Sequence, residues 1–244
     1  MLSDDQLLRY SRQLVLSELD FIGQRKLLDS RVLVVGAGGL GCPLVLYLAS
    51  SGVGHITIVD HDVVELHNLP RQILFDERDV GKKKALVAAD KLNQQYPDTA
   101  VDAVCLRLTE VSELPEGTFD LMIDATDTPS VGLVLNAYSI VHRVPLLYLA
   151  AVATEGRLFF ARGYEIDKPC LQCYFGSTAD PTGGCHTLGV LAPAVGALAL
   201  LGATQALRAL MGEMQETLLC LDAWRLNTLQ LQVAKSEGCT ACAI

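Results

Sequence analysis

Hydrophobic and polar positions divide the first half of the chain into short apolar runs and longer helical stretches. Residues 31–35 form an apolar run rich in β-branched side chains, and residues 55–60 form a second one that ends in Asp60. Between them lie a glycine-rich turn and an apolar stretch that extends to Ser51. Short β-branched runs bounded by turns are typical of buried strands. This segment therefore predicts a strand, a tight turn, a helix and a second strand.

The same alternation continues to residue 151. It predicts strands at 100–106, 119–124 and 145–151, and helices at 82–96 and 130–142. Two helices, at 3–16 and 21–28, are predicted before the first strand. Strands that alternate with helices form a mostly parallel sheet covered on both faces, so we expect an α/β, Rossmann-like fold.

After residue 151 the pattern changes. Residues 156–163 and 217–233 predict antiparallel strands, and residues 176–185 predict a mobile loop rich in Gly, Pro, Thr and Ser. Between them, residues 187–207 contain no charged side chain. Their length permits a membrane-spanning helix, which needs about 20 residues. Pro193 instead favours a buried helix that begins near Ala192, and no second span or basic flanking loop supports a membrane segment.

Composition and charge narrow the class of protein. The chain has 244 residues, of which 50% are hydrophobic, enough to build a sizeable core in one or two domains. Its net charge of −9 disfavours a nucleic-acid partner. The first residues include Asp4 and Asp5 and no apolar run of a secretory signal follows. We therefore expect a cytoplasmic protein.

The glycine turn carries the first candidate chemistry. Gly36, Gly38 and Gly41 form a GxGxxG pattern, which permits close approach of a phosphate to backbone N–H groups at a helix start. Asp60, at the end of the next strand, can accept hydrogen bonds from ribose hydroxyls. These residues alone predict only a nucleotide site, and an NAD-dependent oxidoreductase is the default interpretation.

Basic and acidic residues outside this turn shift the balance. Arg12, Arg71 and Lys84 can supply cations around a triphosphate, and Asp127 can bind Mg²⁺ at the carboxyl end of a strand. Hydride transfer has no need for this set, whereas release of pyrophosphate requires neutralised charge. The alternative to a phosphate-binding role is that Arg71 and Lys84 are ordinary surface charges and that Arg12 forms a salt bridge on a helix face.

In combination these motifs resemble the ThiF/MoeB/HesA family, the bacterial relatives of ubiquitin-activating enzymes. The resemblance extends from near the start of the chain to Cys242 and includes two CxxC pairs. The other matching segments are RYSRQ (9–13), GQRKL (23–27), VGAGGLGCP (35–43), GVGHITIVDHD (52–62), NLPRQ (68–72), VGKKKA (80–85), DATDT (124–128) and GCHTLGVLAPAVG (184–196).

The resemblance implies an adenylyltransferase that uses ATP to activate the C-terminal Gly-Gly carboxylate of a ubiquitin-like sulfur carrier. The carrier is of the MoaD type in molybdopterin synthesis or of the ThiS type in thiamine synthesis. The family also implies one adenylation domain over residues 1–244. Its parts are N-terminal helices (1–30), a nucleotide-binding core (31–151) and a carrier-binding, zinc-stabilised part (152–244). A homodimer is implied as well, in which Arg12 reaches the partner's active site.

Site residues follow from the same resemblance. It places Gly39 against the nucleotide, Asp60 on the ribose, Asn68, Arg71 and Lys84 on the phosphates, and Mg²⁺ on Asp127. The full nucleotide-binding set is Gly36, Gly38, Gly39, Gly41, Asp60, Asp62, Asn68, Arg71, Lys84 and Asp127.

At two positions the chain departs from the family's pattern. Thr128 stands where the family usually carries Asn, and Gly132 stands where it usually carries Arg. The second change removes a basic group near the expected nucleotide pocket. These departures leave open a scaffold that binds a carrier without catalysis. An ATP-dependent relative acting on a tRNA-bound carboxylate is a further alternative, which the acidic charge and the zinc pair disfavour.

Four of the 8 cysteines form the two CxxC pairs, Cys170 with Cys173 and Cys239 with Cys242. Four thiolates suit a closed, tetrahedral Zn²⁺ site, which we favour over a redox pair. The family supports this zinc site, which then has a structural role.

The remaining cysteines have separate interpretations. Cys185 lies in the glycine-rich loop, where the family often has a cysteine, and it is a candidate for sulfur transfer or a merely exposed thiol. Cys42, Cys105 and Cys220 lie in apolar contexts and are predicted to be core residues.

Overall fold

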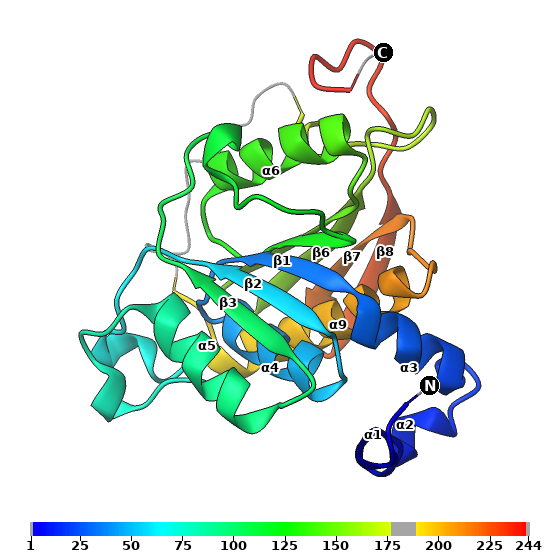
Figure 1. Ribbon diagram of the computed structural model, residues 1–244. Coiled ribbons are helices and arrows are strands. Elements are labelled where there is room, and N and C mark those ends of the chain that lie inside the picture. Colours follow the sequence, from blue (N-terminus) through cyan, green and yellow to red (C-terminus); the bar gives the residue numbers. More distant parts are fainter. Residues whose placement is uncertain (1, 177–188, 243–244) are drawn as a thin grey trace.

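The computed structural model describes residues 2–176 and 189–242, which form one layered α/β structure around a single sheet (Figure 1). The eight strands lie in the order β3-β2-β1-β4-β5-β6-β7-β8. They are β1 (Arg31–Val35), β2 (His55–Val59), β3 (Ala100–Val104), β4 (Leu121–Asp124), β5 (Leu146–Val152), β6 (Glu155–Ala161), β7 (Thr217–Asp222) and β8 (Asn227–Gln232). The first five strands pair in parallel and the last three join antiparallel.

Helices cover both faces of this sheet. They are α1 (Asp4–Arg9), α2 (Ser11–Leu14), α3 (Asp20–Asp29), α4 (Gly41–Ser50), α5 (Lys84–Gln95), α6 (Pro129–His142), α7 (Leu171–Phe175) and α9 (Ala192–Leu210). Three 3-10 turns lie at Leu66–Asn68, Glu77–Asp79 and Val111–Glu113. The predicted Rossmann-like architecture with an antiparallel extension is thus confirmed.

The pleat of β1 shows why both faces are needed. Val32 and Val34 belong to the core cluster beneath α4, α5 and α9, whereas Leu33 and Val35 belong to the cluster on the side of α6 and α7. Successive side chains of a strand point to opposite faces, so a strand that is apolar throughout must be covered twice. Figure 1 shows α6 on one side of the sheet and α4, α5 and α9 on the other.

The apolar segment before residue 210 forms the predicted core helix. α9 begins at Ala192 with a proline in its first turn, as expected. Its buried face includes Val195, Leu198 and Ala199, which pack in the cluster under the sheet. Among the described residues, α9 is the one helix whose length and apolar composition would also permit it to cross a membrane. Its packing against β5 and β6 accounts for that composition.

The N-terminal helix is shorter than predicted. A single helix over 3–16 is wrong, because α1 and α2 are separated at Tyr10. The Tyr10 ring is buried, and its hydroxyl donates to Asp98 at 3.1 Å. Anchoring this ring turns the chain where the sequence pattern alone would continue a helix.

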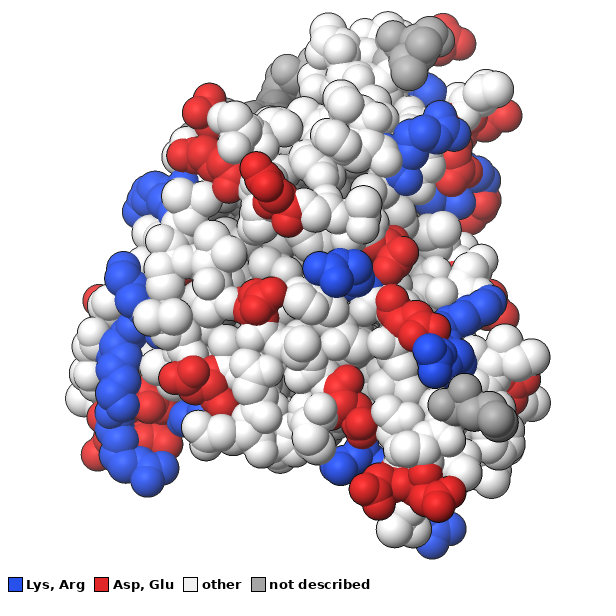
Figure 2. Space-filling model, viewed as in Figure 1, with Lys and Arg blue, Asp and Glu red and all other residues white. Residues whose placement is uncertain are grey.

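The last strand is the least protected part of the sheet. Every residue of β8 is exposed, including Leu229 and Leu231, and its outer side pairs with no described strand. On the face in Figure 2, Lys and Arg side chains lie among Asp and Glu side chains. That the chain binds no nucleic acid stays a prediction.

The strand order indicates which edge of the sheet is suited to bind a ligand. The direction of winding reverses between β1 and β4, and the carboxyl ends of β1, β2 and β4 lie at one edge of the sheet. In open α/β sheets this reversal point is where ligands bind.

The long connection from β2 to α5 folds back over this edge and is pinned to α5. Lys91 donates to the Leu74 carbonyl at 3.0 Å and to Asp76 at 3.2 Å, and it also pairs with Asp79. These contacts come from the middle of α5, so they fix the connection independently of any bound ligand. Residues 68–72 are thereby held near the glycine turn.

We expect Asp79→Asn to weaken this anchor. Burial alone would raise the pKa of Asp79, but the hydrogen bond and charge of Lys91 hold that pKa below its usual range. The carboxylate therefore stabilises the fold above the unfolded pKa of about 4, and this contribution is lost as the pH falls through the lower folded value. The variant should melt a few degrees lower at neutral pH and lose less stability on acidification. Thermal unfolding followed by circular dichroism at several pH values measures both effects, and parallel curves for the two proteins would contradict the assignment.

Candidate functional site

The glycine turn between β1 and α4 is shaped by close backbone approach. Gly36 has φ +99°, and a Cβ there would lie 2.8 Å from the Ala125 carbonyl oxygen. A Cβ at Gly41 would lie 1.9 Å from the Gly36 carbonyl oxygen. The packing of the protein itself therefore requires glycine at both positions.

Gly38 differs from these two. The nearest atom to a Cβ there is the Gln72 Nε2, at 3.8 Å, which is an ordinary van der Waals contact. Its backbone is not left-handed, since no positive φ occurs at this glycine. The missing side chain leaves open space before the first turn of α4, where backbone N–H groups can bind a phosphate.

Asp60 ties the end of β2 to this turn. It is buried, its Oδ2 accepts from the Ala37 N–H at 2.7 Å, and its Oδ1 accepts from the Asp62 N–H at 2.8 Å. A carboxylate has about four acceptor positions, so capacity remains for ribose hydroxyls.

Lys84 and Asp62 form a pair at the start of α5. Lys84 is buried, and its Nζ donates to the Asp62 Oδ2 at 3.0 Å. Burial alone would raise the pKa of Asp62, but the Lys84 ammonium holds it below its usual range. The alternative that Lys84 is an ordinary surface charge is wrong. The pairing fixes where this buried ammonium lies.

Asp60, His61 and Asp62 are also close enough to share a metal ion. Their carboxylate oxygens, however, already accept hydrogen bonds from the Ala37 and Asp62 N–H groups and from Lys84. This group is explained by its positioning contacts.

Arg71 lies over the glycine turn. Its Cγ would be 3.4 Å from a Cβ at Gly39, and its Nη1 donates to the His67 carbonyl at 3.0 Å. Asn68 is buried at the end of a 3-10 turn, and its side-chain oxygen accepts from the Glu65 N–H at 3.3 Å. The stem of Arg71 thus lies against Gly39, and the His67 carbonyl holds its guanidinium.

The loop after β4 carries Asp127. Asp124 is fully buried, and its Oδ1 accepts from the Thr126 N–H at 3.0 Å and from the Thr126 hydroxyl at 2.7 Å. Burial raises the pKa of Asp124 to about 7. Asp127 itself is exposed, and its Oδ1 accepts from the Thr128 hydroxyl at 3.3 Å. Since Ala125 contacts Gly36, this loop begins at the glycine turn.

The structure gives a packing reason for Gly132. A Cβ there would lie 2.7 Å from the Asp124 Oδ2 and 2.9 Å from the Leu171 Cδ2. The helix α6 therefore passes so close to Asp124 and α7 that no side chain fits without movement. The Asp124 Oδ2 has no hydrogen-bond partner.

Arg12 does not reach this site within one chain. The neighbouring Gln13 donates to the Ser51 carbonyl at 2.9 Å, at the carboxyl end of α4. α4 has 10 residues and is about 15 Å long, and the glycine turn lies at its other end. Cys185 lies outside the described residues, as does the predicted loop from residue 177 onward.

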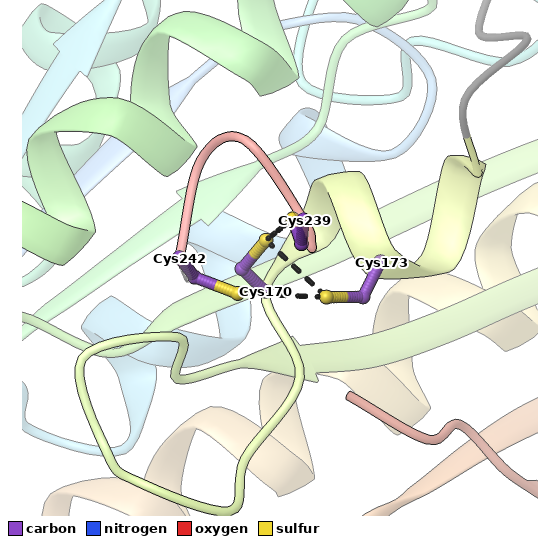
Figure 3. A group of neighbouring side chains, drawn as sticks. All are labelled: Cys170, Cys173, Cys239 and Cys242. Atoms are coloured by element: carbon purple, nitrogen blue, oxygen red, sulfur yellow. Dashed lines mark hydrogen bonds between the residues drawn. The ribbon is translucent and has the colours of Figure 1, made fainter. Parts of the chain in front are cut away.

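The two CxxC pairs meet as predicted. In Figure 3 their sulfur atoms point toward one another, from the start of α7 and from the segment near the C-terminus. The Sγ atoms of Cys170 and Cys173 are 3.7 Å apart, those of Cys170 and Cys239 3.6 Å, and those of Cys173 and Cys242 3.5 Å. A tetrahedral Zn²⁺ with Zn–S bonds of about 2.3 Å requires sulfur separations of about 3.8 Å. The donor set and its spacing fit zinc.

Close backbone packing brings the four sulfur atoms of this cluster together. A Cβ at Gly163, in the turn after β6, would lie 2.4 Å from the Cys170 Cβ and 2.9 Å from the Cys242 Cβ, so the two cysteines can approach only because this position has no side chain. Burial alone would raise the pKa of Cys173, but N–H groups of Ser236 and Cys170 and neighbouring thiols lower it to about 7. Burial raises the pKa of Cys170 and of Cys242 in the same cluster, so the favourable surroundings of a thiolate are confined to Cys173.

Outcomes differ among the other cysteines. Cys42 is buried, as predicted, and its Sγ contacts the Ala37 carbonyl at 3.2 Å. The core prediction is wrong for Cys105, which is exposed just after the edge strand β3. Cys220 is only partly buried. Gln72, Lys91 and Asp124 are site-forming residues to which sequence reasoning assigned no role.

The sequence profile of the ThiF family matches residues 10–241. The molybdopterin-synthase adenylyltransferase of Escherichia coli is 37% identical over 246 residues, covering 99% of this chain and 98% of that protein. The ThiS sulfur-carrier adenylyltransferase of Escherichia coli is 35% identical over 244 residues, covering 99% and 97%. Among solved structures, Escherichia coli MccB with ATP matches with TM-score 0.82 at 23% identity, covering 96% of this chain and 73% of that one.

The turn geometry predicts opposite outcomes for two of its glycines. Gly41→Ala should not fold stably, because its Cβ would overlap the Gly36 carbonyl. Gly38→Ala should fold with an unchanged melting temperature, because its Cβ meets only an ordinary contact, but it should bind nucleotide at least about tenfold more weakly. Thermal unfolding and calorimetric titration with ATP and Mg²⁺ measure these properties. Equal ATP affinity of Gly38→Ala and the unmodified protein would show that the phosphates lie elsewhere.

Proposed function

This chain belongs to the ThiF family, and from that premise we propose that it adenylates the C-terminal carboxylate of a ubiquitin-like sulfur carrier ending in Gly-Gly. It is an ATP-dependent adenylyltransferase, as its relatives are named. The observation that carries the proposal is the gathering of an open phosphate cradle, a ribose acceptor and two basic side chains at one sheet edge. These are Gly38, Asp60, Arg71 and Lys84.

The chemistry explains why such a set is needed. The carrier carboxylate attacks the α-phosphorus of ATP, the bond from that phosphorus to the bridging oxygen breaks, and pyrophosphate leaves. Both reactants are anionic, so Arg71 and Lys84 offset their repulsion and the charge that develops on the leaving group. Mg²⁺, held by Asp127, supplies further neutralisation when bound. Because Asp62 holds the Lys84 ammonium and the His67 carbonyl holds the Arg71 guanidinium, less side-chain ordering opposes the reaction.

A protein substrate fits the same edge. β6 and β7 pair Glu155 with Asp222, so the turn from β7 to β8 lies at the same edge of the sheet as the carboxyl end of β5, with β6 between them. That turn exposes Trp224 by 73% and Leu226 by 91%. Exposed apolar side chains next to a reactive site suit protein docking. We therefore assign carrier binding to residues 152–244, nucleotide binding to 31–151 and the first helices to 1–30.

A homodimer completes the proposed site. Arg12 is exposed on α2, at the opposite end of α4 from the glycine turn, so only a second chain brings it to the phosphates. Val15, Phe21 and Ile22 add exposed apolar surface around these helices, which supports an interface there. The proposed protein is cytoplasmic, as expected from the sequence, and Cys185 takes part in sulfur transfer.

The relatives bear on the type of carrier. Those named for molybdopterin synthase and for ThiS match almost equally, so the carrier is of either type.

Exchange of labelled pyrophosphate into ATP tests this function. With a MoaD-type or ThiS-type carrier ending in Gly-Gly, exchange should require the carrier. Asp127→Ala should lower the rate about a hundredfold or more while the fold persists, because charge on the leaving pyrophosphate is then less neutralised. Asp167→Ala removes an exposed carboxylate from a distant loop and should exchange normally.

Two results would count against the proposal. Carrier binding without exchange would favour the scaffold alternative suggested by Thr128 and Gly132. Normal exchange by Asp127→Ala would remove that residue from the site.

We further propose that the cysteine cluster holds a structural zinc ion. Cys170 and Cys173 flank the start of α7, and Cys239 and Cys242 lie 69 positions further along the chain from Cys170 and Cys173 respectively. Zinc would link the C-terminal segment to α7. The start of α7 is also tied to α6, since the Asn136 side chain accepts from the Leu171 N–H at 2.8 Å.

Metal analysis tests the zinc site directly. Purified protein should contain about one zinc per chain, and Cys170→Ser should lose both zinc and thermal stability, because three thiolates no longer close the site. Cys105→Ser changes an exposed cysteine outside the cluster and should retain both. Unmodified protein that contains no zinc, when prepared without chelators, would refute this assignment.

A further inference from the structure

Gln72 immediately follows Arg71, yet no role has been assigned to it. Its side chain is buried, with 3% exposure. Among the described residues, only two buried side-chain nitrogen or oxygen atoms lack a hydrogen bond, the Gln72 Oε1 and the Asp124 Oδ2. Both residues lie next to the glycine turn. The other buried side-chain polar atoms of the described residues have hydrogen-bond partners.

The two amide atoms of Gln72 have different surroundings. Oε1 is fully enclosed without a donor, whereas Nε2 lies 3.8 Å from the position of a Cβ on Gly38. No hydrogen bond from Nε2 occurs within the described residues. The amide N–H₂ group is therefore presented to the open side of the phosphate cradle, and the carbonyl is left inside.

An unpaired buried carbonyl lowers stability, because its hydrogen bonds to water are lost and nothing replaces them. The backbone does not force this arrangement on a glutamine, since an apolar side chain of equal length would fill the same space. Buried polar groups left unpaired in a native structure often mark a functional constraint. Here the constraint points to the Nε2 end of the amide.

The surroundings of Nε2 select the class of ligand. Gly38 precedes the first turn of α4, whose free N–H groups favour anions. The neighbouring position beside Gly39 is closed by Arg71 and by Val195, whose Cγ1 would lie 3.1 Å from a Cβ there. The open position over Gly38 is thus bordered by a helix N-terminus, a guanidinium-bearing side chain and an amide donor. An anionic oxygen is the acceptor that this set fits.

We propose that Gln72 is a nucleotide-binding residue whose Nε2 donates a hydrogen bond to a phosphate oxygen held over Gly38. The inference rests on the proposed function only in taking ATP as that nucleotide. Lys91 supports it indirectly, because its bond to the Leu74 carbonyl fixes the backbone two residues beyond Gln72. The side chain is thereby positioned before the nucleotide arrives.

This role has a signature that a structural role lacks. Gln72→Met keeps the length of the side chain but removes both the donor and the unpaired carbonyl. The free protein should therefore melt at the same or a higher temperature, whereas a hydrogen bond to an anion should be lost. We expect the Kd for ATP with Mg²⁺ to rise about tenfold or more, and the melting shift produced by ATP to shrink accordingly. Gln72→Glu should bind ATP more weakly still, because a carboxylate would face the phosphates.

Calorimetric titration with ATP and Mg²⁺, and thermal unfolding with and without them, test the proposal on the whole chain. Ile73→Ala is the matched control, because Ile73 is the next residue and is exposed. It should leave the Kd unchanged. An unchanged Kd for ATP in Gln72→Met would overturn the inference, whatever the melting temperature of the free variant.

The same measurements separate this inference from the proposed function. Unmodified protein that binds ATP but shows no carrier-dependent pyrophosphate exchange would defeat the proposed function, while a weakened Kd in Gln72→Met would still support the role of Gln72. Unmodified protein that does not bind ATP at all would overturn the inference itself.

Discussion

The close approach of backbone at the glycine turn is the constraint on which this structure depends. α4 can begin where it does only because Gly41 has no side chain to meet the Gly36 carbonyl, and β4 can lie beside the turn only because Gly36 has none to meet Ala125. Asp60 adds β2 to the same point through the Ala37 N–H. Three strand ends and a helix start therefore meet within a few residues, and every side chain of the candidate site is placed relative to that junction.

From this junction outward, charge is positioned by pairing. Lys91 anchors the connection between β2 and α5 to the middle of α5. Arg71 and Gln72, on the same connection, lie against the glycine turn. Lys84 is held by Asp62 at the first turn of α5. A site for a highly charged ligand needs cations that neither collapse onto the protein nor reorganise on binding, and these contacts satisfy both needs.

The sequence predicted this framework well because its signals are local. β-branched runs mark β1 and β2, and Pro193 marks the start of α9. The spacing of the cysteines likewise predicted that the two pairs would meet. Contacts between distant segments were not predictable in the same way. The helix break at Tyr10 depends on Asp98, the burial of Lys84 depends on how α5 packs, and the crowding at Gly132 depends on α7. A local sequence pattern carries no information about such contacts between distant segments.

The outer side of β8 has a consequence for the behaviour of the chain at high concentration. Its sequence, Asn227–Gln232, contains no proline and no charged residue, and all of it is exposed. Bare N–H and C=O groups along such a strand are a template for a foreign strand, which most proteins block with charge, proline or a covering loop. Self-association through this border is therefore favoured as the protein is concentrated. A lysine in place of Leu229 or Leu231 would be the simplest way to keep the molecules apart.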